Sequence, residues 1–171
     1  MRLFIAIRLS EEMCAKIAAY QRALRAQGLR AGYSHTENLH LTLAFLGERP
    51  DADAVIAALE KLTFSPFPLS PDESGRFGDV FWIGLKESAP LTALVRDLRA
   101  LLKDAGIAFD KKPFRAHITV ARYLRGEVPA VSVPHGEMRV SRVSLMRSEL
   151  IEGRRVYTEL YAKEAGKQHV C

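Results

Sequence analysis

Two short segments of the chain repeat one pattern, and this repeat constrains the fold more than any other feature of the sequence. Residues 40–43 and 117–120 each read histidine, apolar residue, threonine, apolar residue. Both segments lie in apolar runs, at residues 39–46 and 114–121, that predict β-strands. One such triplet in a strand is more often a half-exposed polar pair than a site, but chance spacing gives only about 0.2 triplets in a chain of this composition. Two copies therefore predict a shared functional site.

Strand geometry decides which side chains of each copy lie together. Successive side chains of a strand point to opposite faces, so His40 and Thr42 share one face and His117 and Thr119 share one face. The opposite face of the first copy then carries apolar residues, namely Leu39, Leu41, Leu43 and Phe45. Each copy is thus expected to present an imidazole and a hydroxyl side by side, over an apolar core.

Length and composition fit a soluble globular protein. Of the 171 residues, 48% are hydrophobic and 26% are charged, which is enough to bury a core and ordinary for such a domain. No uninterrupted apolar run approaches the ~20 residues of a membrane-spanning helix, and the N-terminal apolar run is too short for a signal peptide. Cys14 and Cys171 form no close-spaced pair of the kind used in disulfide frameworks or metal motifs. We expect a cytoplasmic monomer that does not associate with membranes.

Positive charge is in excess along the chain. The formal net charge of +5 and the isoelectric point near 9.4 suit a polyanionic partner such as nucleic acid. Most of the basic residues are arginines, whose planar donor groups match phosphate well. The same side chains also serve as an ordinary solvated surface, so the charge permits a nucleic-acid partner without requiring one.

Hydrophobic periodicity and turn residues predict the elements around the two motifs. We expect helices at residues 11–27, from residue 50 to about 62, and from residue 90 to about 105. Further strands are expected at residues 2–8, 77–85, 138–150 and 154–161, with a bulge or bend at Gly78 and Asp79. The remaining segments are expected to be a loop at residues 29–38, a proline-rich extended stretch at 64–71, a turn at 72–75 and a connection at 126–134.

An internal duplication relates the two halves of the chain. Each half reads strand, helix, histidine strand, and Phe4 precedes His40 by as many residues as Phe81 precedes His117. The order predicts an α+β fold with two lobes related by a pseudo-twofold axis, mainly antiparallel sheets flanked by helices, and the two histidine strands facing each other across a central cleft. Residues 1–162 would form this single bilobal catalytic domain, and residues 163–171 a frayed C-terminal tail.

Two histidine and threonine pairs suit chemistry on a phosphodiester. Cleavage needs a base for the attacking oxygen, an acid for the leaving oxygen, and donors to the other phosphate oxygens. An imidazole with an ordinary pKa near ~6.5 can be neutral or charged at working pH, so His40 and His117 can supply the acid and the base. The hydroxyls of Thr42 and Thr119 can supply the donors. The residues alone leave open which histidine is the acid.

This scheme requires no metal ion and no cofactor. No cluster of carboxylates accompanies the paired histidines, and the chain has no close pair of cysteines. The remaining histidines, His35, His135 and His169, stand in expected loops or in the tail and are given no chemical role.

The two motifs resemble the signature of the two-histidine phosphoesterase superfamily. More narrowly, residues 38–47 and 113–122 are similar to the bacterial and archaeal RNA 2',3'-cyclic phosphodiesterases, formerly called 2'-5' RNA ligases. Residues 2–7 and 82–85 fit the same family, so the resemblance spans about residues 1–125. The strands expected beyond that point match the family only in type.

The resemblance implies a specific reaction. It implies metal-independent hydrolysis of RNA 2',3'-cyclic phosphate ends to 2'-phosphate ends, with His40 as proton donor and His117 as proton acceptor. Thr42 and Thr119 would bind the phosphate, and weak reverse 2',5' ligation would be a side reaction. The alternatives are phosphodiesterase activity on 2',5'-linked oligonucleotides or small cyclic nucleotides, and a non-catalytic module that binds RNA ends.

Two further residues are candidates for substrate contact. Arg122 stands where the family pattern has an arginine, but strand alternation would turn it away from the histidine face unless a bulge intervenes. Its alternative role is a structural ion pair. Phe45, Phe114 and Tyr123 can stack a base, although an aromatic residue in a core strand more often belongs to the core. Arg122 and Phe45 are the expected substrate-binding residues of this group.

Overall fold

The protein is described by a computed structural model, which covers residues 1–166. In this part of the chain the helices are α1 (Glu11–Ala26), α2 (Asp53–Glu60), α3 (Ala89–Asp104) and the short 3-10 helix η1 (Thr36–Asn38). The strands are β1 (Arg2–Arg8), β2 (Arg30–Tyr33), β3 (His40–Glu48), β4 (Phe67–Leu69), β5 (Pro71–Phe77), β6 (Val80–Leu85), β7 (His117–Arg125), β8 (Met138–Val140), β9 (Arg142–Ile151) and β10 (Arg154–Glu164). None of the described helices is long and apolar enough to cross a membrane.

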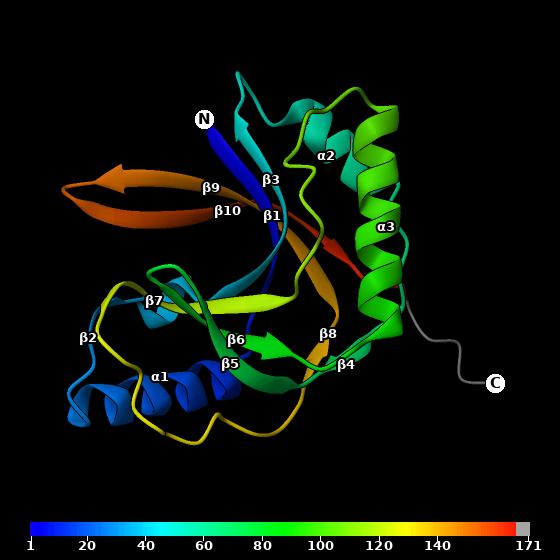
Figure 1. The fold of residues 1–171 in the computed structure, drawn as a ribbon. Coiled ribbons are helices and arrows are strands. Elements are labelled where there is room, and N and C mark those ends of the chain that lie inside the picture. The colour runs from blue at the N-terminus through cyan, green and yellow to red at the C-terminus, as the bar shows by residue number, and fades with distance from the viewer. Residues whose placement is uncertain (167–171) are drawn as a thin grey trace.

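Eight of the strands form one antiparallel sheet. Its order is β10-β9-β1-β3-β7-β6-β5, with β2 paired to β7, while β4 and β8 form a separate two-stranded sheet. The large sheet has two halves, one containing β1, β3, β9 and β10 and the other containing β2, β5, β6 and β7, as Figure 1 shows. The two halves meet where β3 pairs with β7. The predicted α+β class with mainly antiparallel strands is confirmed.

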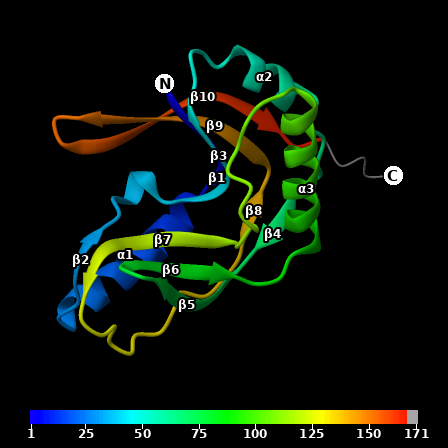
Figure 2. The same cartoon turned by 45° about the horizontal axis from the view of Figure 1, so that its top comes forward.

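Each half of the sheet is covered by a helix that follows a strand of the other half. Helix α1 follows β1 but packs against the second half, where the Tyr20 ring lies 6.3 Å from the Phe81 ring of β6. Helix α3 follows β6 but contacts α2 and β3 of the first half, an arrangement visible in Figure 2. Both helices begin at a serine cap, because the Ser10 and Ser88 hydroxyls accept hydrogen bonds from backbone N–H groups at 3.1 and 3.2 Å.

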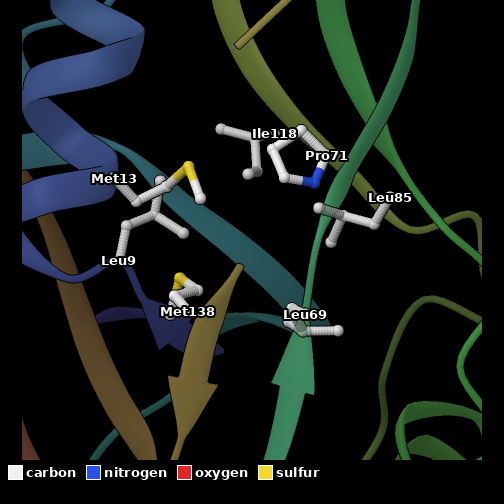
Figure 3. Close-up of a pocket in the computed structure, with 7 residues that line it drawn as sticks. All are labelled: Leu9, Met13, Leu69, Pro71, Leu85, Ile118 and Met138. Atoms are coloured by element: carbon white, nitrogen blue, oxygen red, sulfur yellow. The ribbon is translucent and has the colours of Figure 1, made fainter. Parts of the chain in front are cut away.

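The core face of the histidine strands is apolar throughout. Leu41 and Ile118, which separate histidine from threonine in the two motifs, are 0% and 1% exposed. A small apolar pocket lies on this core side of β7 (Figure 3), and its lining residues are Leu9, Met13, Leu69, Pro71, Leu85, Ile118 and Met138. The apolar packing leaves the opposite face of both strands for the polar residues.

Two of the segments predicted in the first half of the chain are wrong. Residues 29–38 are not one loop, because they contain β2 and η1. The turn expected at residues 72–75 belongs to β5, whereas the chain does turn at Gly78 and Asp79, where a bulge or bend was expected. Gly75 fits inside a strand because the Trp82 ring lies over it, where a Cβ on residue 75 would stand 2.4 Å from the ring. Gly78 suits the turn because its φ is +58°.

The C-terminal part also departs from prediction. The strand expected at 138–150 is interrupted at Ser141, because β8 pairs with β4 whereas β9 pairs with β1. The last strand continues to Glu164 through pairing with β9, so Lys163 and Glu164 are not part of a frayed tail. The remainder of the predicted tail, from residue 167, lies outside the described residues.

Candidate active site

The pairing of β3 with β7 brings the two motifs together. Leu41 lies opposite Ile118 in an antiparallel register, so His40 is placed opposite Thr119, and Thr42 opposite His117. All four polar side chains project from the face away from the core and are partly exposed. The two histidines thus stand on one diagonal of the pair and the two threonines on the other. Alternation correctly predicted that each histidine shares a face with its own threonine. The two strands, however, pair with each other in one sheet, and do not face each other across a cleft as expected.

His40 is held by hydrogen bonds at both ring nitrogens. Its Nδ1 lies 2.6 Å from the Asn38 carbonyl oxygen, and its Nε2 lies 2.9 Å from Thr42 Oγ1. A carbonyl only accepts hydrogen bonds, so Nδ1 carries a proton and Nε2 is the nitrogen that gains or loses one. The ring also packs 5.0 Å from Phe4 and edge-on to Tyr157 at 5.3 Å. Local sequence and distant aromatic residues together fix the ring.

The surroundings of His40 lower its pKa. Burial disfavours the charged imidazolium and is the largest cause, while the positive charges of Arg122 and His117 act in the same direction. The hydrogen bond to the Asn38 carbonyl opposes this effect. The free protein therefore favours the neutral imidazole at His40, with Nε2 accepting from the Thr42 hydroxyl.

His117 makes the same backbone contact in different surroundings. Its Nδ1 lies 2.6 Å from the Arg115 carbonyl oxygen, two residues earlier, as His40 does with residue 38. Its ring meets Phe77 edge-on at 5.5 Å and lies 6.1 Å from Trp82. The Trp82 Nε1 atom is buried and has no hydrogen-bond partner among the described residues. Both histidines thus direct Nε2 away from their own backbone carbonyl.

A β-bulge follows the threonine of the first motif. Two consecutive residues of β1 pair with Thr42 and Ala44, which leaves Leu43 without a partner. One extra residue reverses the alternation of side chains beyond it. Phe45 is therefore not on the core face, as strand parity predicts, but is 50% exposed on the face of His40. Its ring lies 6.4 Å from that of Phe4, which contacts His40.

An equivalent bulge follows the threonine of the second motif. Two consecutive residues of β6 pair with Thr119 and Ala121, which leaves Val120 without a partner. Val120 and Ala121 are both buried, and Arg122 is exposed on the same face as Thr119. Its charge is close enough to lower the pKa of His40. The bulge that Arg122 needs in order to face the histidines is present.

The other aromatic candidates lie elsewhere. Phe114 packs against the hydrophobic core, and Tyr123, which is 72% exposed with a φ of +58°, lies against Gly32 of β2. Phe4 and Phe81 are not equivalent either, since Phe4 is on the His40 face while Phe81 packs against α1. The equal spacing of these two phenylalanines from the histidines therefore joins residues on opposite faces.

Several residues near the histidines were not identified from the sequence. Arg8 pairs directly with His40 and lines a small pocket with it, together with Phe4, Glu37, Asn38, Leu39, Met146 and Tyr157. The alternation of the first strand could have placed Phe4 and Arg8 on one face, but Tyr157 comes from β10 and no spacing signals its contact with His40. Phe77 and Trp82 join the site because β5 and β6 pair beside β7.

The remaining histidines and the metal-ligating side chains are scattered. Among residues 1–166, no group of three or more His, Cys, Asp and Glu side chains is placed to hold a metal ion. His35 precedes η1, and the backbone carbonyl of His135 accepts a hydrogen bond from Lys16 Nζ at 2.9 Å. His169 lies outside the described residues.

The fold and the paired motifs define a two-histidine phosphoesterase. The family model of the 2'-5' RNA ligase superfamily matches residues 10–151, and the chain belongs to this family. The structure is similar to a crystal structure of Escherichia coli LigT complexed with 3'-AMP, with a TM-score of 0.80 and 28% sequence identity over 97% of this chain and 98% of that one.

Curated relatives agree with the family assignment. An RNA 2',3'-cyclic phosphodiesterase of Archaeoglobus fulgidus is 33% identical over 94% of this chain and 98% of its own length. A protein of the same name from Geobacillus stearothermophilus is 34% identical over 74% of this chain, but the match spans only 43% of that relative.

Proposed function

We propose that this protein hydrolyses terminal 2',3'-cyclic phosphates of RNA to 2'-phosphates. The main observation behind this proposal is the antiparallel register of β3 and β7, which places two histidines and two threonines on one face of the sheet. Membership of the family, with relatives named RNA 2',3'-cyclic phosphodiesterase, supports this activity. The net charge of +5 suits an RNA partner.

The two imidazoles divide the proton transfers. Water attacks phosphorus, its oxygen forms the new bond to phosphorus, and its proton passes to His117 Nε2. The bond from phosphorus to the 3'-oxygen breaks, and His40 Nε2 gives its proton to that oxygen, leaving a 3'-hydroxyl and a 2'-phosphate. The hydrogen bonds from each Nδ1 to a backbone carbonyl at 2.6 Å support these roles, since they leave Nε2 to face the substrate.

The threonine hydroxyls stabilise charge on the phosphate. Thr42 and Thr119 donate to the non-bridging oxygens, where negative charge increases in the transition state. In the free protein Thr42 Oγ1 lies 2.9 Å from His40 Nε2, so its hydroxyl turns from the imidazole to the phosphate when substrate binds. The phosphate charge then raises the lowered pKa of His40 and favours the imidazolium that an acid requires.

Arg122 and Phe45 extend the site beyond the reacting group. The Arg122 guanidinium pairs with the phosphate, and the half-exposed Phe45 ring offers a surface on which the terminal base stacks. No step of this scheme requires a metal ion. When an RNA 5'-hydroxyl attacks phosphorus in place of water and the 3'-oxygen leaves, the same groups give weak 2',5' ligation.

Two other functions use the same geometry. Hydrolysis of 2',5'-linked oligonucleotides or small cyclic nucleotides needs the same acid and base, and differs in the loops that hold the substrate. A module that only binds RNA ends would need the basic surface but not the two histidines. The presence of both motifs favours catalysis over binding alone.

The deciding experiment is hydrolysis of an RNA oligonucleotide that ends in a 2',3'-cyclic phosphate. The assay contains EDTA and compares the wild type with His40→Ala and His117→Ala, and the product isomer is identified. A 2'-phosphate that forms with the wild type and is lost with both variants is expected. Turnover that stops in EDTA and returns with a divalent ion would remove the metal-free scheme, and full activity of either variant would remove its histidine from the mechanism.

A further inference from the structure

A buried glutamine on α1 contacts the bulge of β7. Gln21 is 7% exposed, and among residues 1–166 only Gln21 and Ser144 are buried polar side chains. Its Nε2 donates to the Val120 carbonyl at 2.9 Å and to the Ser34 carbonyl at 3.0 Å. Burying an amide costs free energy unless its hydrogen bonds are made, so both donor hydrogens of Gln21 are used. Through Gln21, helix α1 is hydrogen-bonded to β7, the strand that carries His117.

Ser34 completes the contact from the segment that follows β2. Its backbone N–H donates to the Val120 carbonyl at 3.0 Å, and its hydroxyl donates to the Thr119 carbonyl at 3.1 Å. The carbonyls of two successive residues are therefore held, and one of them belongs to the residue that β6 leaves unpaired. We refer to Gln21 and Ser34 together as the bulge clamp.

The bulge of β3 lacks such a clamp. In the described part of the chain, no side chain donates a hydrogen bond to a backbone carbonyl of residues 42–44. The nearest backbone contact from outside the sheet is the Asp110 N–H, which donates to the Phe45 carbonyl at 3.0 Å. A side-chain clamp is thus a property of the second motif, where the residue after the bulge is an arginine rather than a phenylalanine.

We infer that Gln21 is a positioning residue for the second motif, which holds the Val120 bulge so that Thr119 and Arg122 both face the phosphate. This inference rests on the proposed function for its catalytic consequence, but its structural content does not depend on activity. Without the bulge, strand alternation would place residue 122 on the face opposite Thr119. The clamp therefore fixes which face receives the guanidinium.

The first test follows the imidazole of His40 by NMR titration, which needs no substrate. Arg122 lowers the pKa of His40, so Arg122→Gln should raise it. Gln21→Leu keeps the volume of the side chain and removes both donors, and it should raise the pKa of His40 in the same direction. In the variant that combines Gln21→Leu with Arg122→Gln, the two increases in the pKa of His40 should not add. The reason is that either change alone already removes the Arg122 charge from His40.

The matched control is Leu24→Ala, at a fully buried residue of the same helix whose side chain has no polar atom. It should destabilise the fold without changing the titration of His40. The inference would be overturned if Arg122→Gln changed the pKa of His40 and Gln21→Leu left it as in the wild type. It would also be overturned by a shift of equal size in Leu24→Ala, because that would show a general loosening of the helix.

The second test uses turnover of the cyclic phosphate. Gln21→Leu is expected to lower kcat/KM by about 10-fold or more and to make a further Arg122→Gln change nearly silent, whereas Arg122→Gln keeps its full effect in the Leu24→Ala background. Full turnover by Gln21→Leu with an undiminished Arg122 effect would contradict the positioning role. If the wild type does not act on the cyclic phosphate, the proposed function fails, and the NMR titration alone decides the inference.

Discussion

The two histidines share one local structure and differ in everything that surrounds it. Each Nδ1 lies 2.6 Å from the carbonyl oxygen two residues earlier, and each ring is followed by a threonine on the same face. His40 is enclosed by Phe4 and Tyr157, with Nε2 against Thr42, whereas His117 meets Phe77 edge-on and lies beside Trp82. The motif therefore fixes the tautomer of both rings, and residues distant in sequence bury His40 and lower its pKa.

The two bulges show the same division. Both follow the threonine by one residue and return the next side chains to the site, but one delivers Phe45 and the other Arg122. One half of the site gains an aromatic ring and the other a charge. A repeated backbone irregularity thus brings two different side chains to the same face of the sheet.

The strongest way to break the comparison is to remove one proton transfer at a time. His40→Ala and His117→Ala should each lower kcat on the cyclic phosphate by about 10²–10⁴-fold. On an aryl phosphodiester such as bis(p-nitrophenyl) phosphate, whose leaving group needs no proton, His40→Ala should recover most of its loss and His117→Ala should not. Recovery by His117→Ala instead would exchange the acid and the base.

Removal of a single hydroxyl should have the next largest effect. Thr42→Val and Thr119→Val each remove a donor to the phosphate oxygens, so kcat should fall by about 10²-fold in either variant. Thr42→Ser and Thr119→Ser keep the hydroxyl and serve as controls. A Val variant with the activity of its Ser counterpart would show that the hydroxyl does not contact the reacting phosphate.

The pH dependence sharpens the assignment of His40. Arg122 lowers the pKa of His40, so Arg122→Gln should raise this pKa and move the matching limb of the kcat/KM profile to higher pH. If His40 is the acid, it must be protonated, and the limb that falls on the alkaline side is the one that moves. Movement of the acid limb would make His40 the base, and an unmoved profile would place Arg122 too far away to act.

The smallest expected effect is on stability, through the packing of Gly75 against the Trp82 ring beside His117. Gly75→Ala places a Cβ against the Trp82 ring, and overpacking of this kind should lower the free energy of unfolding by about 1–3 kcal/mol, measured by urea denaturation. In a Trp82→Leu background the same substitution should cost little, since the ring is gone. A full cost in both backgrounds would point to the β5 backbone rather than to the indole.

Periodicity was enough to predict the four polar side chains of the site. His40, Thr42, His117 and Thr119 alternate with buried residues over the three positions that precede either bulge, so strand parity holds there. Parity failed for Phe45, because an extra residue in a strand leaves no mark in a pattern of apolar residues. Alternation alone would have turned Arg122 away from the histidines, and only the resemblance to the family indicated that it faces them.

Contacts made by distant strands were beyond the reach of the sequence. Tyr157 reaches His40 because β10 pairs with β9 and β9 with β1, and the pairing of β9 with the distant strand β1 leaves no local pattern in the sequence. The interruption of the strand at Ser141 has the same origin, because the chain before it pairs with β4 and the chain after it pairs with β1. Turn positions failed at Gly75 because a glycine can mark close packing as well as a turn.

The exchange of helices between the two halves of the sheet makes them interlocked parts of one folding unit. Helix α1 is connected to β1 yet covers β6 and β7, and helix α3 is connected to β6 yet covers β3. Neither half can complete its core from its own stretch of chain, so we expect all of residues 1–166 to unfold in a single cooperative transition. We therefore expect no half-folded form in which one histidine keeps its surroundings, so that activity and folding should be lost together.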